Sequence, residues 1–367
     1  MISPCSALRL RIVCILIVTL LAMAPGELLA IQIAPNPNPE FNTITIIPAA
    51  PGENLVPFTN QGIISIQPSA SLSNASRFEN AGGIFNAGTI TNSDLFINNR
   101  VFTLLEGSQF NNLATGTYSG LSGSIGIAGT FVNEGAVTHS LGHITVGETG
   151  EYIQRQAVGS NVTPTTITPD APFTNAGRVH IAAGDFIIDP RSVRAASATY
   201  DQTSTGRTQV DARFQNIGGT VRNAGTITIG ATGEYRQQGF PGPMFAGSTS
   251  NTGTFSNAGM TNINTGVFEN ARFFTNTGAV RIGEGATFTN TDSGIYHQSP
   301  GGTTKIDGKF VNNFAVQNGG AIAVSTTGSF SQVAGTSSIG TGTGNGGTFT
   351  NAGQVNIGQA TTFSSFV

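Results

Sequence analysis

Apolar and polar residues alternate over short stretches through most of the chain. Val179 and Ile181 enclose the polar His180, and Ile227 and Ile229 repeat the same spacing. A period of two residues is the signature of a β-strand with one buried face, whereas an amphipathic helix has a period of about 3.6. No segment after residue 30 carries a convincing helical stripe. The pattern therefore predicts an all-β protein built from many short strands.

The motif F-x-N-x-G recurs along this strand pattern at intervals of about 20 or about 40 residues, which indicates a repeat architecture. The residues that we assign to the structural repeat are Phe131, Asn133, Gly135, Phe173, Asn175, Gly177, Phe214, Asn216, Gly218, Phe255, Asn257, Gly259, Phe274, Asn276, Gly278, Phe349, Asn351 and Gly353. The intervals predict a structural unit of about 20 residues that is often used in pairs.

Phe and Asn of the motif are two residues apart and therefore point to the same side of a strand. Phe favours the interior, and burying Asn beside it costs free energy unless the amide is hydrogen-bonded. Stacked identical coils meet this need, because each Asn can bond the Asn above and below it in an amide ladder. Gly would supply the positive φ or the close approach that a corner requires. An alternative is that Asn-x-Gly marks hairpin turns in a sandwich, but hairpins do not explain the long period.

These observations predict a right-handed parallel β-helix with coils of about 20 residues. Residues 1–30 read as a signal peptide, with an apolar run at Ile12–Ala22, although an uncleaved N-terminal anchor is the alternative. A proline-rich segment or cap follows at 31–57, and the solenoid occupies 58–367. Inserts are expected near 156–172 and 237–251. The sequence stops within a repeat at Val367, which predicts a truncated frame and an open solenoid end able to self-associate.

Two segments carry a resemblance to a known family. Tyr200–Asn216 and Tyr296–Asn312 align without a gap and share Tyr, Gln, Thr, Asp, Phe and Asn at matching positions. They resemble the β-helical passenger repeats of bacterial autotransporter-like and filamentous-haemagglutinin-like surface proteins. The resemblance implies a secreted, extracellular or outer-membrane-associated bacterial protein displayed as a rod, often for adhesion.

Composition narrows the range of partners and chemistry. Charged residues make up only 10% of the chain and the net charge is −3, which argues against nucleic acid as a partner. Both cysteines, Cys5 and Cys14, lie in the predicted signal peptide, so the mature chain would have no disulfide, no thiol nucleophile and no cysteine metal site. No second long apolar run follows, so no membrane span is expected in the mature chain.

Candidate catalytic carboxylates are scattered along the sequence: Asp185, Asp189, Asp201, Asp211, Asp292, Asp307, Glu148, Glu151 and Glu234. Polysaccharide-degrading β-helix enzymes need such groups clustered, with basic residues nearby. Lys305 and Lys309 flank Asp307 and form the best charged cluster, but a solvated coil surface explains this cluster better than a catalytic site does. We assign no catalytic residue on this pattern.

Other motifs give no cofactor or metal site. His139 and His143 have H-x3-H spacing, but four residues of strand span about 13 Å, too far for one ion. The glycine-rich 342–347 fits G-x-G-x-x-G, yet it precedes a strand-like segment and not a helix. Paired threonines could order water on a flat face, but too few coils carry them in register: Thr43/Thr45, Thr89/Thr91 and Thr226/Thr228.

The sequence therefore predicts a non-enzymatic, secreted or cell-surface β-helical protein of adhesin type, with no cofactor. Glycans or surface proteins would bind through its extended polar face of Thr, Ser, Asn and Gln. The alternative is a carbohydrate-active β-helix enzyme of the polysaccharide lyase or glycoside hydrolase type. Three or more carboxylates converging in one groove would favour the enzyme.

Overall fold

A computed structural model describes residues 31–155, 165–167, 172–189, 198–238, 247–339, 347–358 and 362–365. The predicted signal peptide, most of both predicted inserts and residues 342–346 of the glycine-rich motif lie outside these ranges. Within them, all the regular elements are β-strands. No helix of the described part is long and apolar enough to cross a membrane.

The strands form three parallel ladders, which we call faces A, B and C. Face A is a sheet of 16 strands. Its members are β1 (Ile31–Gln32), β3 (Gly52–Asn54), β6 (Ser71–Asn74), β9 (Thr89–Asn92), β12 (Gln109–Asn112), β15 (Thr130–Asn133), β18 (Glu151–Gln154), β21 (Arg178–Ile181), β24 (Arg207–Val210), β27 (Thr226–Ile229), β30 (Thr254–Asn257), β32 (Phe273–Asn276), β34 (Ile295–Gln298), β37 (Ala315–Asn318), β40 (Thr336–Ile339) and β43 (Thr362–Ser365).

Faces B and C are joined because two long strands, β31 (Met260–Asn270) and β33 (Ala279–Asn290), run through both. Face B also contains β4 (Phe58–Asn60), β7 (Phe78–Asn80), β10 (Leu95–Asn98), β13 (Thr117–Gly120), β16 (Ala136–His139), β19 (Thr165–Ile167), β22 (Asp185–Ile188), β25 (Arg213–Ile217), β28 (Glu234–Gln238), β35 (Thr303–Ile306), β38 (Ala321–Val324) and β41 (Thr348–Asn351). Face C also contains β2 (Thr43–Ile46), β5 (Ile63–Ile66), β8 (Gly83–Asn86), β11 (Val101–Leu104), β14 (Ser124–Ile127), β17 (Ile144–Val146), β20 (Phe173–Asn175), β23 (Thr199–Gln202), β26 (Thr220–Asn223), β29 (Ser248–Asn251), β36 (Lys309–Asn312), β39 (Ser329–Gln332) and β42 (Gln354–Ile357).

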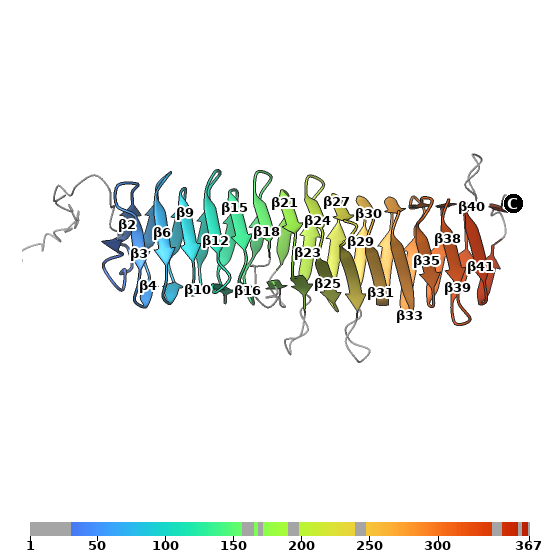
Figure 1. The fold of residues 1–367 in the computed structure, drawn as a ribbon, viewed down its shortest axis with the longest axis horizontal. Helices are drawn as coiled ribbons and strands as arrows, with labels where there is room; N and C mark the ends of the chain where they lie inside the picture. The colour runs from blue at the N-terminus through green and yellow to red at the C-terminus, as the bar shows by residue number, and fades with distance from the viewer. Residues whose placement is uncertain are drawn as a thin grey trace, which may run out of the picture.

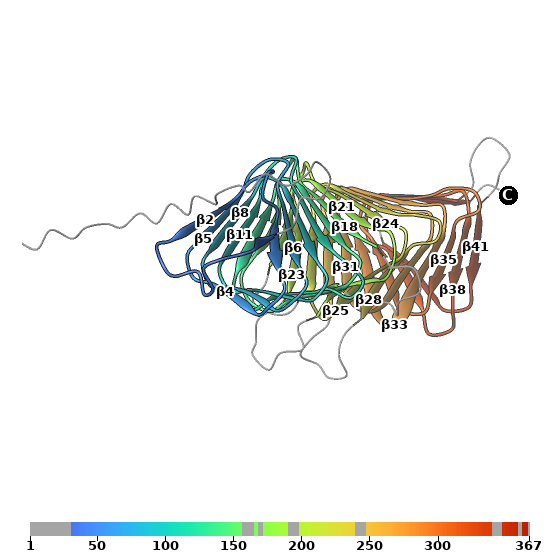
Figure 2. The same ribbon diagram turned by 60° about the vertical axis from the view of Figure 1, so that its left-hand side comes forward.

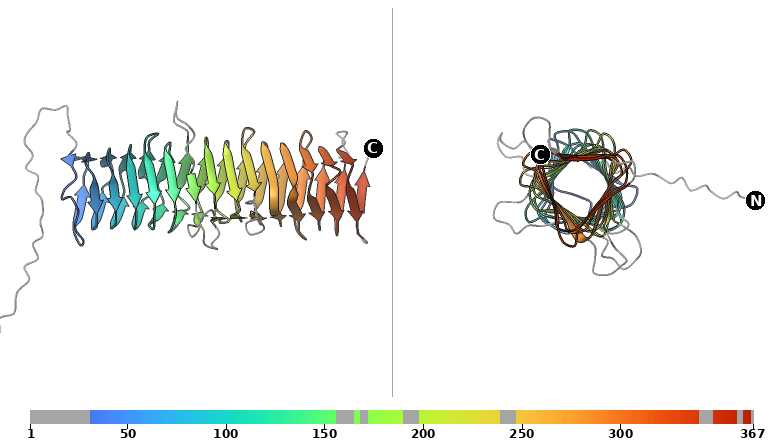
Figure 3. Two further views of the ribbon diagram at one scale, coloured as in Figure 1. Left: turned by 90° about the horizontal axis from the view of Figure 1, so that it is seen from below. Right: turned by 90° about the vertical axis from the view of Figure 1, so that its right-hand side faces the viewer.

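Each coil contributes one strand to each face, and the coils stack into a straight rod (Figures 1 and 2). The end-on view in Figure 3 shows the three faces enclosing one interior, which side chains fill. Equivalent residues of neighbouring coils are typically 18 to 22 residues apart in sequence. The parallel β-solenoid predicted from the repeat is therefore confirmed.

The typical strand has four residues, of which the second and fourth point inward. Phe131 and Asn133 on β15 are buried, while Thr130 and Val132, at the first and third positions, are partly exposed. The chain then turns at Glu134–Gly135 and buries Val137 on the next face. The predicted inward pairing of Phe and Asn is confirmed. The apolar residues that follow the motif lie beyond the corner, on a separate strand of another face.

The motif residues do not form one column. Phe131 lies on face A, Phe173 on face C, Phe214 on face B and Phe255 again on face A. Phe173, Phe214 and Phe349 therefore do not stack in one vertical column, because F-x-N marks a strand and moves from face to face. Rings still stack in shorter runs, such as Phe58, Phe78 and Phe96 with centroids 5.3 and 4.8 Å apart.

The remaining motif residues lie where this scheme places them. Phe274 and Asn276 are buried on face A beside Phe255 and Asn257. Each glycine follows its strand at a corner, as at Gly177, Gly259, Gly278 and Gly353. Phe349 and Asn351 are more exposed on β41, where Ile357 of β42 is also 53% exposed, whereas the preceding coil buries Val324 and Phe330.

The ladders begin inside the proline-rich segment 31–57. β1 pairs with β3, β2 pairs with β5, and Asn38 bridges to Asn60. At the first predicted insert, β19 pairs with both β16 and β22. At the second, β29 pairs with β26. The coil scheme is therefore continuous on both sides of the segments that lie outside the described residues.

Amide ladders run through the interior of the rod along the fourth strand positions. On face A, each Asn donates to the next from Asn54 through to Gln154. On face C, a longer ladder runs from Asn175 to Gln332. The amide ladders predicted from the sequence are therefore confirmed.

The Tyr and Gln repeat has its own structural role. The Tyr200 hydroxyl lies 2.5 Å from Thr208 Oγ1, and the Thr208 hydroxyl also donates to Gln202 Oε1. Tyr296, Thr304 and Gln298 make the same buried triad. A ring at the second strand position and an amide at the fourth thus share one threonine of the next face, which explains the spacing common to the two aligned segments.

Candidate functional site

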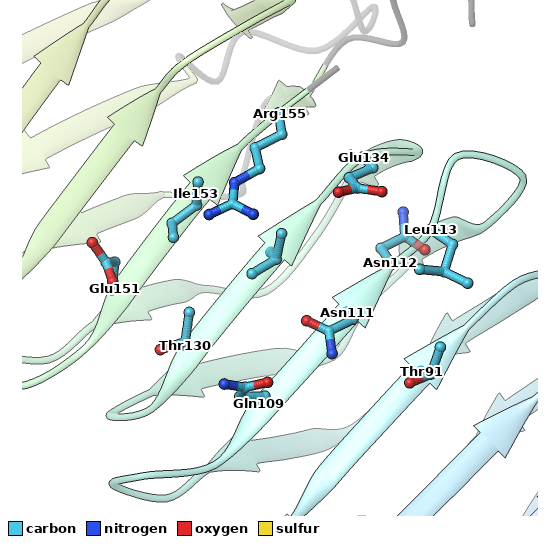
Figure 4. Close-up of a pocket in the computed structure, with 11 residues that line it drawn as sticks. Thr91, Gln109, Asn111, Asn112, Leu113, Thr130, Glu134, Glu151, Ile153 and Arg155 are labelled. Carbon is cyan, nitrogen blue, oxygen red and sulfur yellow. The ribbon is translucent and has the colours of Figure 1, made fainter. Parts of the chain in front are cut away.

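The outward positions of face A carry a hollow in the surface of the rod. A shallow hollow of about 440 Å³ lies over β9, β12, β15 and β18. Figure 4 shows side chains from these neighbouring strands projecting into it. Its polar lining residues are Thr91, Gln109, Asn111, Asn112, Thr130, Glu134, Glu151 and Arg155.

The strand pattern places those side chains that belong to strands in two rows along the rod. Gln109, Thr130 and Glu151 are in register at the first strand position. Asn111 is in register with Val132 at the third position. The parallel pairing therefore repeats the same geometry on each rung, at a spacing of about 4.8 Å.

Apolar side chains form the floor of the hollow. Val132 is partly exposed, and Ile153 is 9% exposed beside it. Leu113, the first residue after β12, is 36% exposed at the corner. The hollow thus combines three apolar side chains with a larger number of amide, hydroxyl and charged groups.

Face B carries a ladder of ion pairs instead. Arg213 lies 3.4 Å from the Asp185 carboxylate and 3.2 Å from that of Glu234. Arg236 also pairs with Glu234 at 3.0 Å, and Asn262 donates to the same carboxylate. These partly exposed pairs satisfy one another across the coils and add little stability individually.

A second charged group surrounds Asp307. Arg281 and Lys305 each lie 3.2 Å from its carboxylate, whereas Lys309 is on face C. Burial acts to raise the pKa of Asp307, but hydrogen bonds from Ser325, Lys305 and Arg281 and the charge of Lys305 outweigh it and lower the pKa. Of the trio singled out in the sequence, Asp307 and Lys305 are thus ion-paired. The second cation beside Asp307 is Arg281 and not Lys309.

The other predicted carboxylates are dispersed. Asp201 pairs with Arg222 on face C, and Asp211 pairs with His180 on face A. Asp189 is 3% exposed at the end of β22, while Glu148 and Asp292 lie in turns. Among the described residues, no group of three or more His, Cys, Asp or Glu side chains could hold a metal ion.

His139 is a buried histidine at the end of β16. Its ring lies against Gly120, where an added Cβ would come within 1.9 Å of Nδ1. Burial is the main cause that lowers the pKa of His139 to about 4. His143 is exposed between β16 and β17, so the H-x3-H spacing puts one histidine inside the rod and the other outside.

The paired threonines lie on different parts of the rod. Thr43 and Thr45 are on β2 of face C, and Thr89 and Thr91 are on β9 of face A. Thr226/Thr228 are on β27, and five strands of face A separate them from β9. The register therefore gives no continuous threonine array on these coils.

Sequence reasoning missed the face A hollow. Apart from Glu151, which the sequence offered as a candidate carboxylate, its outward residues belong to no motif, because outward positions are free to vary while inward positions repeat. Counting positions from Phe131 and Asn133 identifies Thr130 and Val132 as outward. Only the strand register, however, shows that Gln109, Asn111 and Arg155 belong to the same surface.

Comparison with known proteins adds little to this geometry. No family model matches the chain. No curated protein matches it. Among solved structures, the crystal structure of a TibC-catalyzed hyper-glycosylated TibA fragment matches with 15% identity and a TM-score of 0.29, over 92% of this chain and 98% of that one. At this TM-score the likeness supports neither a fold nor a function.

Proposed function

We propose that this protein is a secreted or cell-surface structural rod of adhesin type, which binds glycan or protein surfaces through its extended polar faces. The observation that carries the proposal is the register of polar side chains on the outside of the rod. Ser73, Thr91 and Asn111 occupy equivalent outward positions on three successive rungs of face A. Such rows offer many weak hydrogen bonds along one direction, which suits a long or repetitive partner.

A catalytic role as a polysaccharide lyase or glycoside hydrolase is the competing hypothesis. Asp185 and Glu234 favour it most, because both contact Arg213 and face solvent on one face. Their carboxylates are held in ion pairs, however, and Asp307 belongs to a separate group around Arg281 and Lys305. This dispersal supports binding over catalysis.

The test exposes the purified full chain to glycan arrays, to immobilised protein surfaces and to soluble polysaccharides. We expect saturable binding to at least one of the surfaces, with every polysaccharide recovered at its original length. Release of new reducing ends or unsaturated sugars, abolished by Asp185→Asn or Glu234→Gln, would establish the enzyme instead. Absence of binding to every surface would refute the proposed function.

A further inference from the structure

Five of the polar side chains that line the face A hollow have no side-chain partner within the described chain, whereas Asn112 belongs to the amide ladder and Glu151 pairs with Arg178. Gln109, Asn111, Thr130 and Glu134 make no side-chain hydrogen bond there, and Arg155 makes no ion pair. Figure 4 shows them along neighbouring strands with their polar ends in the same hollow. Their hydrogen-bonding capacity is therefore available to a ligand.

The charged ladder of face B shows the opposite condition. Gln215 donates to Asp185, Arg213 bridges Asp185 and Glu234, and Asn262 donates to Glu234. A ligand there would have to displace contacts that the protein already makes. A ligand in the face A hollow replaces only water, so less interaction energy is lost on binding.

The chemistry of the hollow fits a neutral sugar. The amides of Gln109 and Asn111 can each donate and accept, and so can the Thr130 hydroxyl, which matches the hydroxyl edge of a pyranose ring. Val132 and Ile153 offer an apolar floor for the C–H face of such a ring. No aromatic residue lines the hollow, so the polar rows and this floor carry the recognition.

Charge argues against an acidic ligand. Glu134 and Glu151 both line the hollow, and Arg155 is the one cation among its lining residues. Arg178 lies 3.8 Å from Glu151 and partly neutralises it from the next coil. A polyanionic ligand would therefore be repelled by two carboxylates, whereas an uncharged oligosaccharide would meet no such repulsion.

We propose that the face A hollow is the binding site for a neutral oligosaccharide that lies along the rod axis over β9, β12, β15 and β18. Successive sugars would meet equivalent outward positions on successive rungs, because Gln109, Thr130 and Glu151 are in register. This assignment rests on the proposed binding function and names its ligand class and its place on the rod.

The test measures binding of the full chain to matched panels of neutral and acidic oligosaccharides by titration calorimetry at low and high salt. We expect a neutral oligosaccharide to bind with an affinity that salt leaves unchanged, since no ligand charge is screened. Asn111→Ala and Thr130→Val should each weaken binding by about tenfold, the value of one lost hydrogen bond in a desolvated site. Glu134→Gln at the corner provides a third variant outside the strands.

The matched control is Thr254→Val, which makes the same change at the same strand position of face A, outside the hollow. It should bind as the unaltered protein does. Preference for acidic sugars, or unchanged affinity in all three hollow variants, would overturn the assignment while leaving binding elsewhere on the rod intact. Binding to protein surfaces alone would overturn it too, whereas no binding to any surface would also refute the proposed function.

Discussion

At the scale of single residues, the Asn-x-Gly corner explains how this chain buries amides. Asn112 donates to Asn133 Oδ1 at 2.7 Å and to the Ala136 carbonyl at 3.0 Å, and it accepts from Asn92. A buried amide loses little free energy when its donors and acceptors are filled in this way. At the corner after Asn133, Gly135 is required by space, because a Cβ there would lie 2.1 Å from the Gly116 carbonyl oxygen.

His139 occupies the same strand position as these asparagines but gives the rod a pH dependence. Its pKa of about 4 in the folded chain is below the value of about 6.5 expected after unfolding. The unfolded chain therefore binds more protons between these values, and stability is complete above pH ~6.5 and falls as the pH drops towards 4. The loss should approach about 3 kcal/mol for this one group.

Denaturant unfolding followed across this pH range measures the slope. His139→Leu places an apolar side chain beside Ile167. It should flatten the dependence of the unfolding free energy on pH between pH ~4 and ~6.5. His297→Gln changes a half-buried histidine on face A and should retain the original slope. Equal slopes in the unaltered protein and in His139→Leu would show that His139 is protonated without cost inside the rod.

At the scale of elements, each amide ladder ties a row of strands into one unit. The face C ladder links eight side chains from Asn175 to Gln332, and every link joins one coil to the next. Neighbouring amide hydrogen bonds polarise one another in a low-dielectric interior, so an interruption affects both sides of the break.

Asn270→Leu should therefore cost about 2–4 kcal/mol of unfolding free energy. Leu fills a similar volume, but Asn251 loses its acceptor and Asn290 loses its donor, and both groups stay buried. Asn111→Leu is the matched control, because this outward amide has no internal partner, and it should stay within about 0.5 kcal/mol of the unaltered protein. Chemical denaturation of the two variants decides the point, and an equal small effect would argue against cooperative ladders.

How far the sequence predicts these elements follows from the same residues. The period of two and the inward Phe and Asn could be deduced, because every coil repeats them for the same packing reason. The face to which each strand belongs could not be deduced, because F-x-N fits any face: Phe131 is on face A, Phe173 on face C and Phe214 on face B. The hollow around Asn111 and Arg155 was hidden for a related reason, since outward residues are joined only by strand register.

At the scale of the whole molecule, each coil contacts only its neighbours, as the pairing of every face shows. Stability in such a rod is a sum of coil terms and nearest-neighbour interfaces. Its aromatic contacts are equally local: Phe96, Phe102, Phe110 and Tyr118 pack together within adjacent coils. Damage to one coil should consequently remain confined near that coil.

Gly135→Ala tests this locality. The new Cβ would collide with the carbonyl oxygens of Gly116 and Leu113, so the corner must shift at an expected cost of about 1–3 kcal/mol. Hydrogen exchange should accelerate in β13, β15 and β16 and stay unchanged in β35 and β38, because no direct contact joins the two regions. Gly126→Ala on β14 is the control, since its Cβ meets open space and should change no exchange rate. Uniform acceleration along the rod would mean that the coils unfold as one cooperative unit, and the nearest-neighbour account would then be wrong.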